Sequence, residues 1–100
     1  MKNKFRNTQR KRTFEKIRKH LAEINEEVIL YDGMEDALIG YVEQFGRPPI
    51  ALYDRQKCIE VLARDKMTYE EAEEYFAFNT IGGYVGTSTP AFATLLKAEV

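Results

Sequence analysis

His20 and Cys58 are the side chains with the most versatile chemistry, and the chain has one of each. A general base needs an orienting partner and a substrate pocket, and a cysteine nucleophile needs a nearby base. His20 is followed by Leu21 and preceded by Arg18 and Lys19, on a segment rich in positive charge. We interpret it as a surface or interface histidine, and Cys58 as a buried, inert thiol. The sequence thus predicts no catalytic residue, and we expect that the protein is not an enzyme.

Metal binding is the next chemistry to consider. One cysteine and one histidine can form neither a disulfide within the chain nor a Cys/His zinc site. Asp32, Glu35 and Asp36 cluster around Gly33, and three carboxylates this close in sequence could hold a hard cation such as Mg²⁺. Their spacing does not match an EF-hand loop, and turn and helix-cap chemistry explains the same residues. We predict no metal and no cofactor.

A glycine-rich stretch over residues 82–89 offers a different kind of site. It has the composition of a phosphate-binding loop but lacks both the P-loop lysine and the GxGxxG spacing. Glycines that permit tight turns are one interpretation. The other is a pocket for a small polar ligand, and its candidate residues are Tyr31, Tyr53, Asp54, Asn79 and Tyr84.

Acidic side chains are concentrated in one predicted helix. Acids suit the first turn of a helix, but four exceed what capping requires. With neighbouring tyrosines, such a face could imitate nucleic acid or bind a basic groove on another protein. The alternative is a solvated face. The candidate partner-binding residues of this face are Glu70, Glu71, Glu73, Glu74 and Tyr69.

Charge is divided unequally along the chain. Residues 1–20 contain nine Lys and Arg and one Glu, whereas the remainder contains six Lys and Arg and fifteen Asp and Glu. Such a basic arm could bind phosphates, with an affinity that falls steeply with salt, or an acidic protein surface. It could also be a solvated terminus that folds back on the acidic body. The candidate partner-binding residues of the arm are Lys4, Arg6, Arg10, Lys11 and Arg12.

Several elements must position these residues. Apolar residues at helical spacing predict a helix over 14–27, capped by Thr13. Asp54 caps a predicted helix over 55–65. The Thr68-to-Glu71 capping box opens a predicted helix over 69–79.

Strand signals occupy the segments between these helices. We expect strands over 28–31 and 50–53, and favour a strand over a helix for 36–45. Gly46-Arg47-Pro48-Pro49 is expected to break the chain, and 91–100 to form a short terminal helix or irregular structure. These elements predict an α+β fold with an N-terminal helix, a small antiparallel sheet, two consecutive helices and a glycine-rich C-terminal segment.

A series of short motifs runs through residues 28–93. The motifs are Tyr31-Asp32-Gly33, Asp36-Ala37-Leu38-Ile39-Gly40, Ala51-Leu52-Tyr53-Asp54, Lys57-Cys58-Ile59-Glu60-Val61-Leu62, Met67-Thr68-Tyr69-Glu70-Glu71-Ala72-Glu73-Glu74-Tyr75-Phe76, Asn79, Gly82-Gly83-Tyr84-Val85-Gly86 and Thr89-Pro90-Ala91-Phe92. With these motifs, residues 28–93 resemble a family of small uncharacterised proteins of tailed phages and bacteria. The resemblance implies a compact domain and an origin in a phage or mobile element, and it implies no catalytic residues.

Composition limits the class of protein. With 44% apolar and 31% charged residues the chain is too hydrophobic for wholesale disorder, and no apolar run reaches the ~20 residues of a membrane span. We expect a basic flexible arm over 1–12, one compact domain over 13–100 and a cytoplasmic location. The predicted function is a non-enzymatic, phage-type factor that engages or inhibits a host protein. The alternatives are nucleic-acid binding through residues 2–19 and small-ligand binding.

Overall fold

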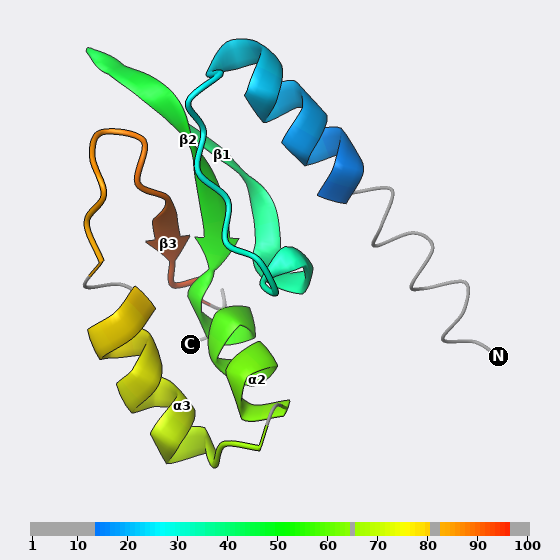
Figure 1. Ribbon diagram of the computed structural model, residues 1–100, viewed down its shortest axis with the longest axis vertical. Coiled ribbons are helices and arrows are strands. Elements are labelled where there is room, and N and C mark those ends of the chain that lie inside the picture. The colour runs from blue at the N-terminus through cyan, green and yellow to red at the C-terminus, as the bar shows by residue number, and fades with distance from the viewer. Residues whose placement is uncertain (1–13, 65, 81–82, 97–100) are drawn as a thin grey trace, which may run out of the picture.

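The structure is a computed structural model that describes residues 14–64, 66–80 and 83–96. Its elements confirm the α+β class (Figure 1). In chain order they are an N-terminal helix over 14–24, the short 3-10 turn η1 (Glu35–Ala37), the strands β1 (Leu38–Gln44) and β2 (Arg47–Asp54), the helices α2 (Arg55–Arg64) and α3 (Tyr69–Tyr75), the wide π-helical turn η2 (Phe76–Thr80) and the strand β3 (Ala91–Ala93).

β1 and β2 form an antiparallel hairpin that turns at Phe45 and Gly46, where Gly46 adopts a φ of +77°. The strand expected within 36–45 is therefore confirmed. The break expected over 46–49 is confirmed at Gly46, which lies in the turn, but is wrong for residues 47–49, which belong to β2. Pro48 and Pro49 lie inside β2, where the pairing shifts by one residue. Proline is tolerated there because this half of β2 has only one neighbouring strand and needs fewer backbone donors.

β3 corrects the expected C-terminal structure. It pairs in parallel with Leu52 to Asp54, so the sheet has the order β1-β2-β3 and is mixed rather than antiparallel. Three residues are too few to produce a strand pattern in the sequence. Packing selects this strand: Phe92 stacks on Tyr53 with ring centres 5.9 Å apart and meets the edge of Phe76 at 5.0 Å.

The strand expected over 28–31 is also absent. These residues are irregular, and the backbone N–H of Tyr31 donates to Tyr53 Oη at 2.8 Å instead of to a neighbouring strand. Val28 and Leu30 are half-buried against the core. The apolar side chains of this run therefore serve to fill the core. A β-prone composition does not distinguish residues that are buried in this way from residues that pair in a strand.

Two of the helix starts follow the predicted caps. Asp54 Oδ1 accepts from the N–H of Lys57 at 3.2 Å, and both hydrogen bonds of the Thr68–Glu71 capping box are present. The helix expected over 69–79 is α-helical only to Tyr75 and widens into η2. The N-terminal helix ends three residues earlier than expected, at 24, and its predicted cap, Thr13, lies outside the described residues.

The core lies between the N-terminal helix, the sheet and the α2–α3 pair. α2 and α3 lie side by side at the end of the sheet opposite the hairpin turn (Figure 1). The largest fully buried side chains are Tyr53, Phe76, Leu21, Ile59 and Cys58. Among the described residues, no helix is both long and apolar enough to cross a bilayer.

Candidate binding surfaces

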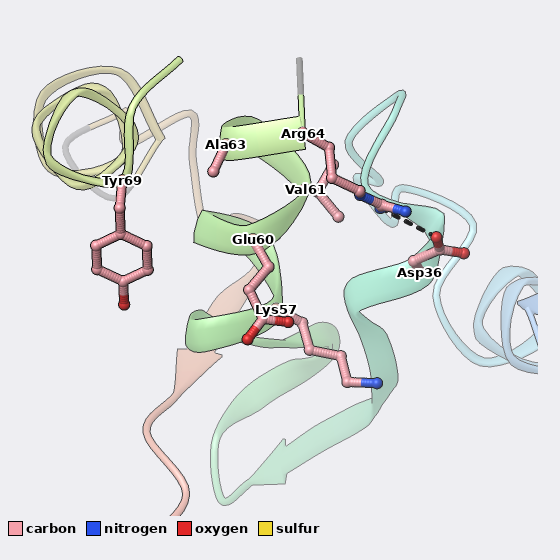
Figure 2. A pocket seen from close by; sticks show the side chains of 7 residues that line it. All are labelled: Asp36, Lys57, Glu60, Val61, Ala63, Arg64 and Tyr69. Carbon is pink, nitrogen blue, oxygen red and sulfur yellow. Dashed lines mark hydrogen bonds and ion pairs between the residues drawn. The ribbon is translucent and has the colours of Figure 1, made fainter. Parts of the chain in front are cut away.

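One face of α2 lines a hollow with a volume of about 480 Å³ (Figure 2). Lys57, Glu60 and Arg64 follow helical spacing and share this face. Asp36 of η1 stands on one side of them and Tyr69, at the start of α3, on the other. We call this surface the α2 hollow. It is lined by Asp36, Lys57, Glu60, Val61, Ala63, Arg64 and Tyr69.

Most polar groups of the α2 hollow already bind one another. Arg64 and Asp36 form an ion pair with 3.1 Å between nitrogen and oxygen. Tyr69 Oη donates to Gln56 Oε1 at 3.0 Å, and Gln56 Nε2 lies 3.4 Å from Glu60 Oε2. These bonds tie α2 to η1 and α3. An exposed ion pair contributes only about 0–1 kcal/mol, so this surface is chiefly a junction between elements.

A second hollow, of about 360 Å³, lies along α3 and η2. Glu71, Glu74, Tyr75 and Phe78 recur at intervals of three and four residues, so they form one exposed stripe. The opposite stripe, Ala72, Phe76 and Thr80, is buried. We call this surface the α3 hollow. It is lined by Lys66, Met67, Glu71, Glu74, Tyr75, Phe78 and Asn79.

Two of the exposed aromatic side chains of the fold line the α3 hollow. Phe78 is 82% exposed and Tyr75 is 42% exposed. Burial of a Phe side chain contributes about 1.5–3 kcal/mol, and folding leaves most of that unused at Phe78. η2 carries Phe78, and π-helical turns of this kind are frequent at functional sites. Phe78 is not among the residues predicted from the sequence. Its spacing of three from Tyr75 and four from Glu74 indicates that the three share one stripe.

The residues of the predicted acidic face do not share one surface. Glu71 and Glu74 lie in the α3 hollow, Tyr69 turns to α2, Glu70 is exposed and Glu73 is half-buried. The Glu71 carboxylate accepts from the N–H of Thr68 at 2.8 Å and is thus engaged in the cap. Glu74 has no hydrogen bond or ion pair with any other described residue, which leaves its carboxylate available to a partner.

The residues predicted for a small-ligand pocket occupy different places. Tyr31 and Tyr53 are brought together, with ring centres 5.6 Å apart, but Tyr53 is fully buried. Asp54 caps α2, and Asn79 lines the α3 hollow. Tyr84, 75% exposed, lines a separate hollow of about 80 Å³ beside the β1–β2 hairpin. These five residues therefore have different surroundings, and small-ligand binding stays a prediction.

His20 and Cys58 lie in different environments. His20 is exposed on the N-terminal helix, where its Nε2 lies 3.2 Å from Tyr41 Oη. Cys58 is fully buried in α2, and burial, with a smaller contribution from the Asp54 carboxylate, raises the pKa of its thiol to about 12. A nucleophile needs access and a reachable base. Cys58 has no access to solvent.

Two of the three carboxylates around Gly33 are engaged in local bonds. Glu35 Oε1 accepts from the N–H of Gly33 at 3.1 Å, and Asp36 pairs with Arg64. No group of three or more metal-ligand side chains occurs within residues 14–64, 66–80 and 83–96. The basic-arm candidates, Lys4, Arg6, Arg10, Lys11 and Arg12, lie outside those residues.

Comparisons with protein-family models, with curated proteins and with solved structures gave no match. The resemblance to small phage and bacterial proteins therefore stays a prediction.

Proposed function

We propose that this chain is a non-enzymatic binding protein whose α3 hollow binds a basic surface on another protein. The observation that carries the proposal is Phe78, 82% exposed and flanked on the same stripe by Tyr75 and the carboxylate of Glu74. Exposed aromatic rings become the energetic centre of many protein interfaces when a partner covers them. Surrounding carboxylates steer a positively charged partner into place.

A host-cell protein is the partner that best suits the phage-type factor expected from the sequence. Engagement through a single acidic, aromatic helix face needs no catalytic group. It can inhibit the host protein by covering a basic functional surface.

The test is a capture experiment with the immobilised full chain and a pair of charge-reversal variants. Glu70→Lys/Glu74→Lys reverses two exposed carboxylates of α3. Glu26→Lys/Glu43→Lys makes the same change at two exposed carboxylates elsewhere. We expect a host protein that is retained by the wild type and the second variant and lost from the first. Once purified, that host protein should bind the Glu70→Lys/Glu74→Lys variant at least about ten-fold more weakly than it binds the wild type. Equal retention by both variants would contradict the proposal.

Nucleic-acid binding is a second candidate, because the basic run continues into the described helix. Lys16 and Lys19 are exposed there and have no partner among the described residues. Each phosphate contact should add to a steep decrease in affinity with salt. Lys16→Gln/Lys19→Gln should weaken a gel shift at low salt, whereas Lys57→Gln/Lys66→Gln should not. A gel shift insensitive to both variants and to salt would exclude this role.

A further inference from the structure

The α3 hollow presents two aromatic rings and one available carboxylate on a single stripe. Tyr75 and Phe78 supply the rings, and Glu74 supplies the carboxylate. Glu71 adds a second negative charge, although its carboxylate also holds the helix cap. An apolar side chain of a partner would form no favourable interaction with these carboxylates, and an anionic side chain would be repelled by them.

A cation is therefore the favoured occupant, and its position along α3 is constrained by charge. Lys66 also lines the hollow, so an incoming cation avoids that end. Glu74, Tyr75 and Phe78 lie farther along the stripe. A planar cation that stacks on a ring while pairing with a carboxylate fits this combination better than a compact ammonium.

The fold itself contains one contact of this kind. The guanidinium carbon of Arg55 lies 5.4 Å from the centre of the Phe76 ring, on the segment that continues into Phe78. Arginine over an aromatic face is stabilised by the ring quadrupole, and more so as water is excluded. Phe76 is buried and makes this contact within the molecule, whereas the Phe78 ring is exposed to solvent.

We propose that the α3 hollow is a receptor for an arginine side chain, supplied by an arginine-rich segment of the partner protein. The guanidinium stacks on Phe78 and Tyr75 and pairs with the carboxylate of Glu74. This inference rests on the proposed function and specifies the chemistry that the partner must present. The charge complementarity between a carboxylate-lined hollow and a basic segment selects this occupant.

The test titrates the full chain into three fluorescein-labelled peptides of repeated Arg-Gly-Gly, Lys-Gly-Gly and citrulline-Gly-Gly. Citrulline keeps the shape of arginine and removes its charge. We expect the arginine peptide to bind about ten-fold more tightly than the citrulline peptide and several-fold more tightly than the lysine peptide. Amide NMR shifts on arginine-peptide binding should centre on Glu74, Tyr75 and Phe78.

Matched variants identify the groups that contribute. Phe78→Ala and Glu74→Gln should each weaken arginine-peptide binding by about five- to ten-fold. Phe45→Ala removes a fully exposed ring at the hairpin turn, and Glu43→Gln neutralises an exposed carboxylate on β1. Both controls should change the affinity less than about two-fold. Circular dichroism of each variant confirms that the fold is retained.

Two results would overturn the receptor: equal affinity for the arginine and citrulline peptides, or equal losses from Phe78→Ala and Phe45→Ala. Failure here is distinguishable from failure of the proposed function. If the captured host protein still depends on the α3 charges while the peptides show no arginine preference, the docking surface stands and the arginine receptor does not. If the peptides show the preference while capture ignores the α3 charges, the hollow binds arginine but the captured protein docks elsewhere, and the proposed function fails.

Discussion

At the residue scale, Cys58 and Tyr53 are the fully buried groups that can ionise within the part of the chain that the structure describes. Burial raises the pKa of both to about 12, from ordinary values of 9.0 and 10.0. The folded state therefore keeps these protons at a pH at which the unfolded chain has released them. Their contribution to stability is fully present below about pH 9 and is lost as the pH rises towards 12.

We therefore expect the free energy of unfolding to fall between pH 9 and 12, by at most about 1.4 kcal/mol per pH unit for each group. Urea denaturation at a series of pH values measures this decrease. Cys58→Ala removes one of the groups and should make the slope shallower, whatever its effect on the stability at pH 7. An identical slope in the wild type and the variant would show that the thiol does not contribute.

Among residues 14–64, 66–80 and 83–96, Lys66 is the non-glycine residue with a positive φ. Its φ of +76° lies in the left-handed region, which costs a non-glycine residue about 1–2 kcal/mol. Lys66→Gly should relieve that cost, but glycine also has a greater conformational entropy in the unfolded chain, which offsets part of the gain. The net effect should be to stabilise the protein by about 0.5–1 kcal/mol. Urea denaturation provides the measurement. Lys66→Ala removes the same side chain without freeing the backbone, so equal stabilisation by both substitutions would refute the explanation.

At the element scale, α3 depends on its first turn. Thr68 Oγ1 accepts from the N–H of Glu71 at 3.1 Å while the Glu71 carboxylate holds the N–H of Thr68. The α-helical part spans only seven residues, and so short a helix is marginal without tertiary contacts and caps. The cap therefore also supports the surface on which Glu74 and Tyr75 stand.

Thr68→Ala should lower the free energy of unfolding by about 1 kcal/mol, because it leaves an amide of the first turn without its acceptor. Chemical denaturation followed by circular dichroism measures the loss. Thr87→Ala provides the control, since Thr87 is exposed and has no hydrogen bond among the described residues. Equal stability of the two variants would mean that the capping box contributes nothing.

At the scale of the whole molecule, Asn25 joins three segments that are far apart in the sequence. Its Nδ2 donates to the carbonyl of Pro49 in β2 at 2.9 Å and to Ser88 Oγ at 3.2 Å. Its Oδ1 accepts from the N–H of Glu27 and shapes the turn after the N-terminal helix. One side chain thus fixes the helix end, the outer half of the hairpin and the loop before β3.

Asn25→Asp keeps the acceptor for Glu27 and removes both long-range donors. It should destabilise the protein by about 1–3 kcal/mol, because the Pro49 carbonyl loses its partner and meets a negative charge. Hydrogen exchange should also become faster in residues 86–89. Asn79→Asp makes the same chemical change at an exposed position. Slower or unchanged exchange in the Asn25 variant would count against its role as a junction.

The sequence by itself determined the features whose causes lie within a few residues. The Asp54 cap, the Thr68–Glu71 box and the apolar face that buries Cys58 are local signals, and each predicted its helix. The charge and spacing of Glu71 and Glu74 likewise indicated an acidic helix face. Such signals act between neighbours on one turn and need no information about the rest of the chain.

Only the tertiary structure decided which distant segments meet. Leu52 pairs with Ala91, and Phe92 packs on Tyr31 and Tyr53, although nothing local marks residues 91–93 as a strand. The same packing turns Phe76 inward and leaves Phe78 outside. Which apolar side chains are buried depends on how their shapes fit together in the assembled core. Spacing placed Phe78 on the stripe of Glu74 and Tyr75, but only the packing of the core left its ring exposed.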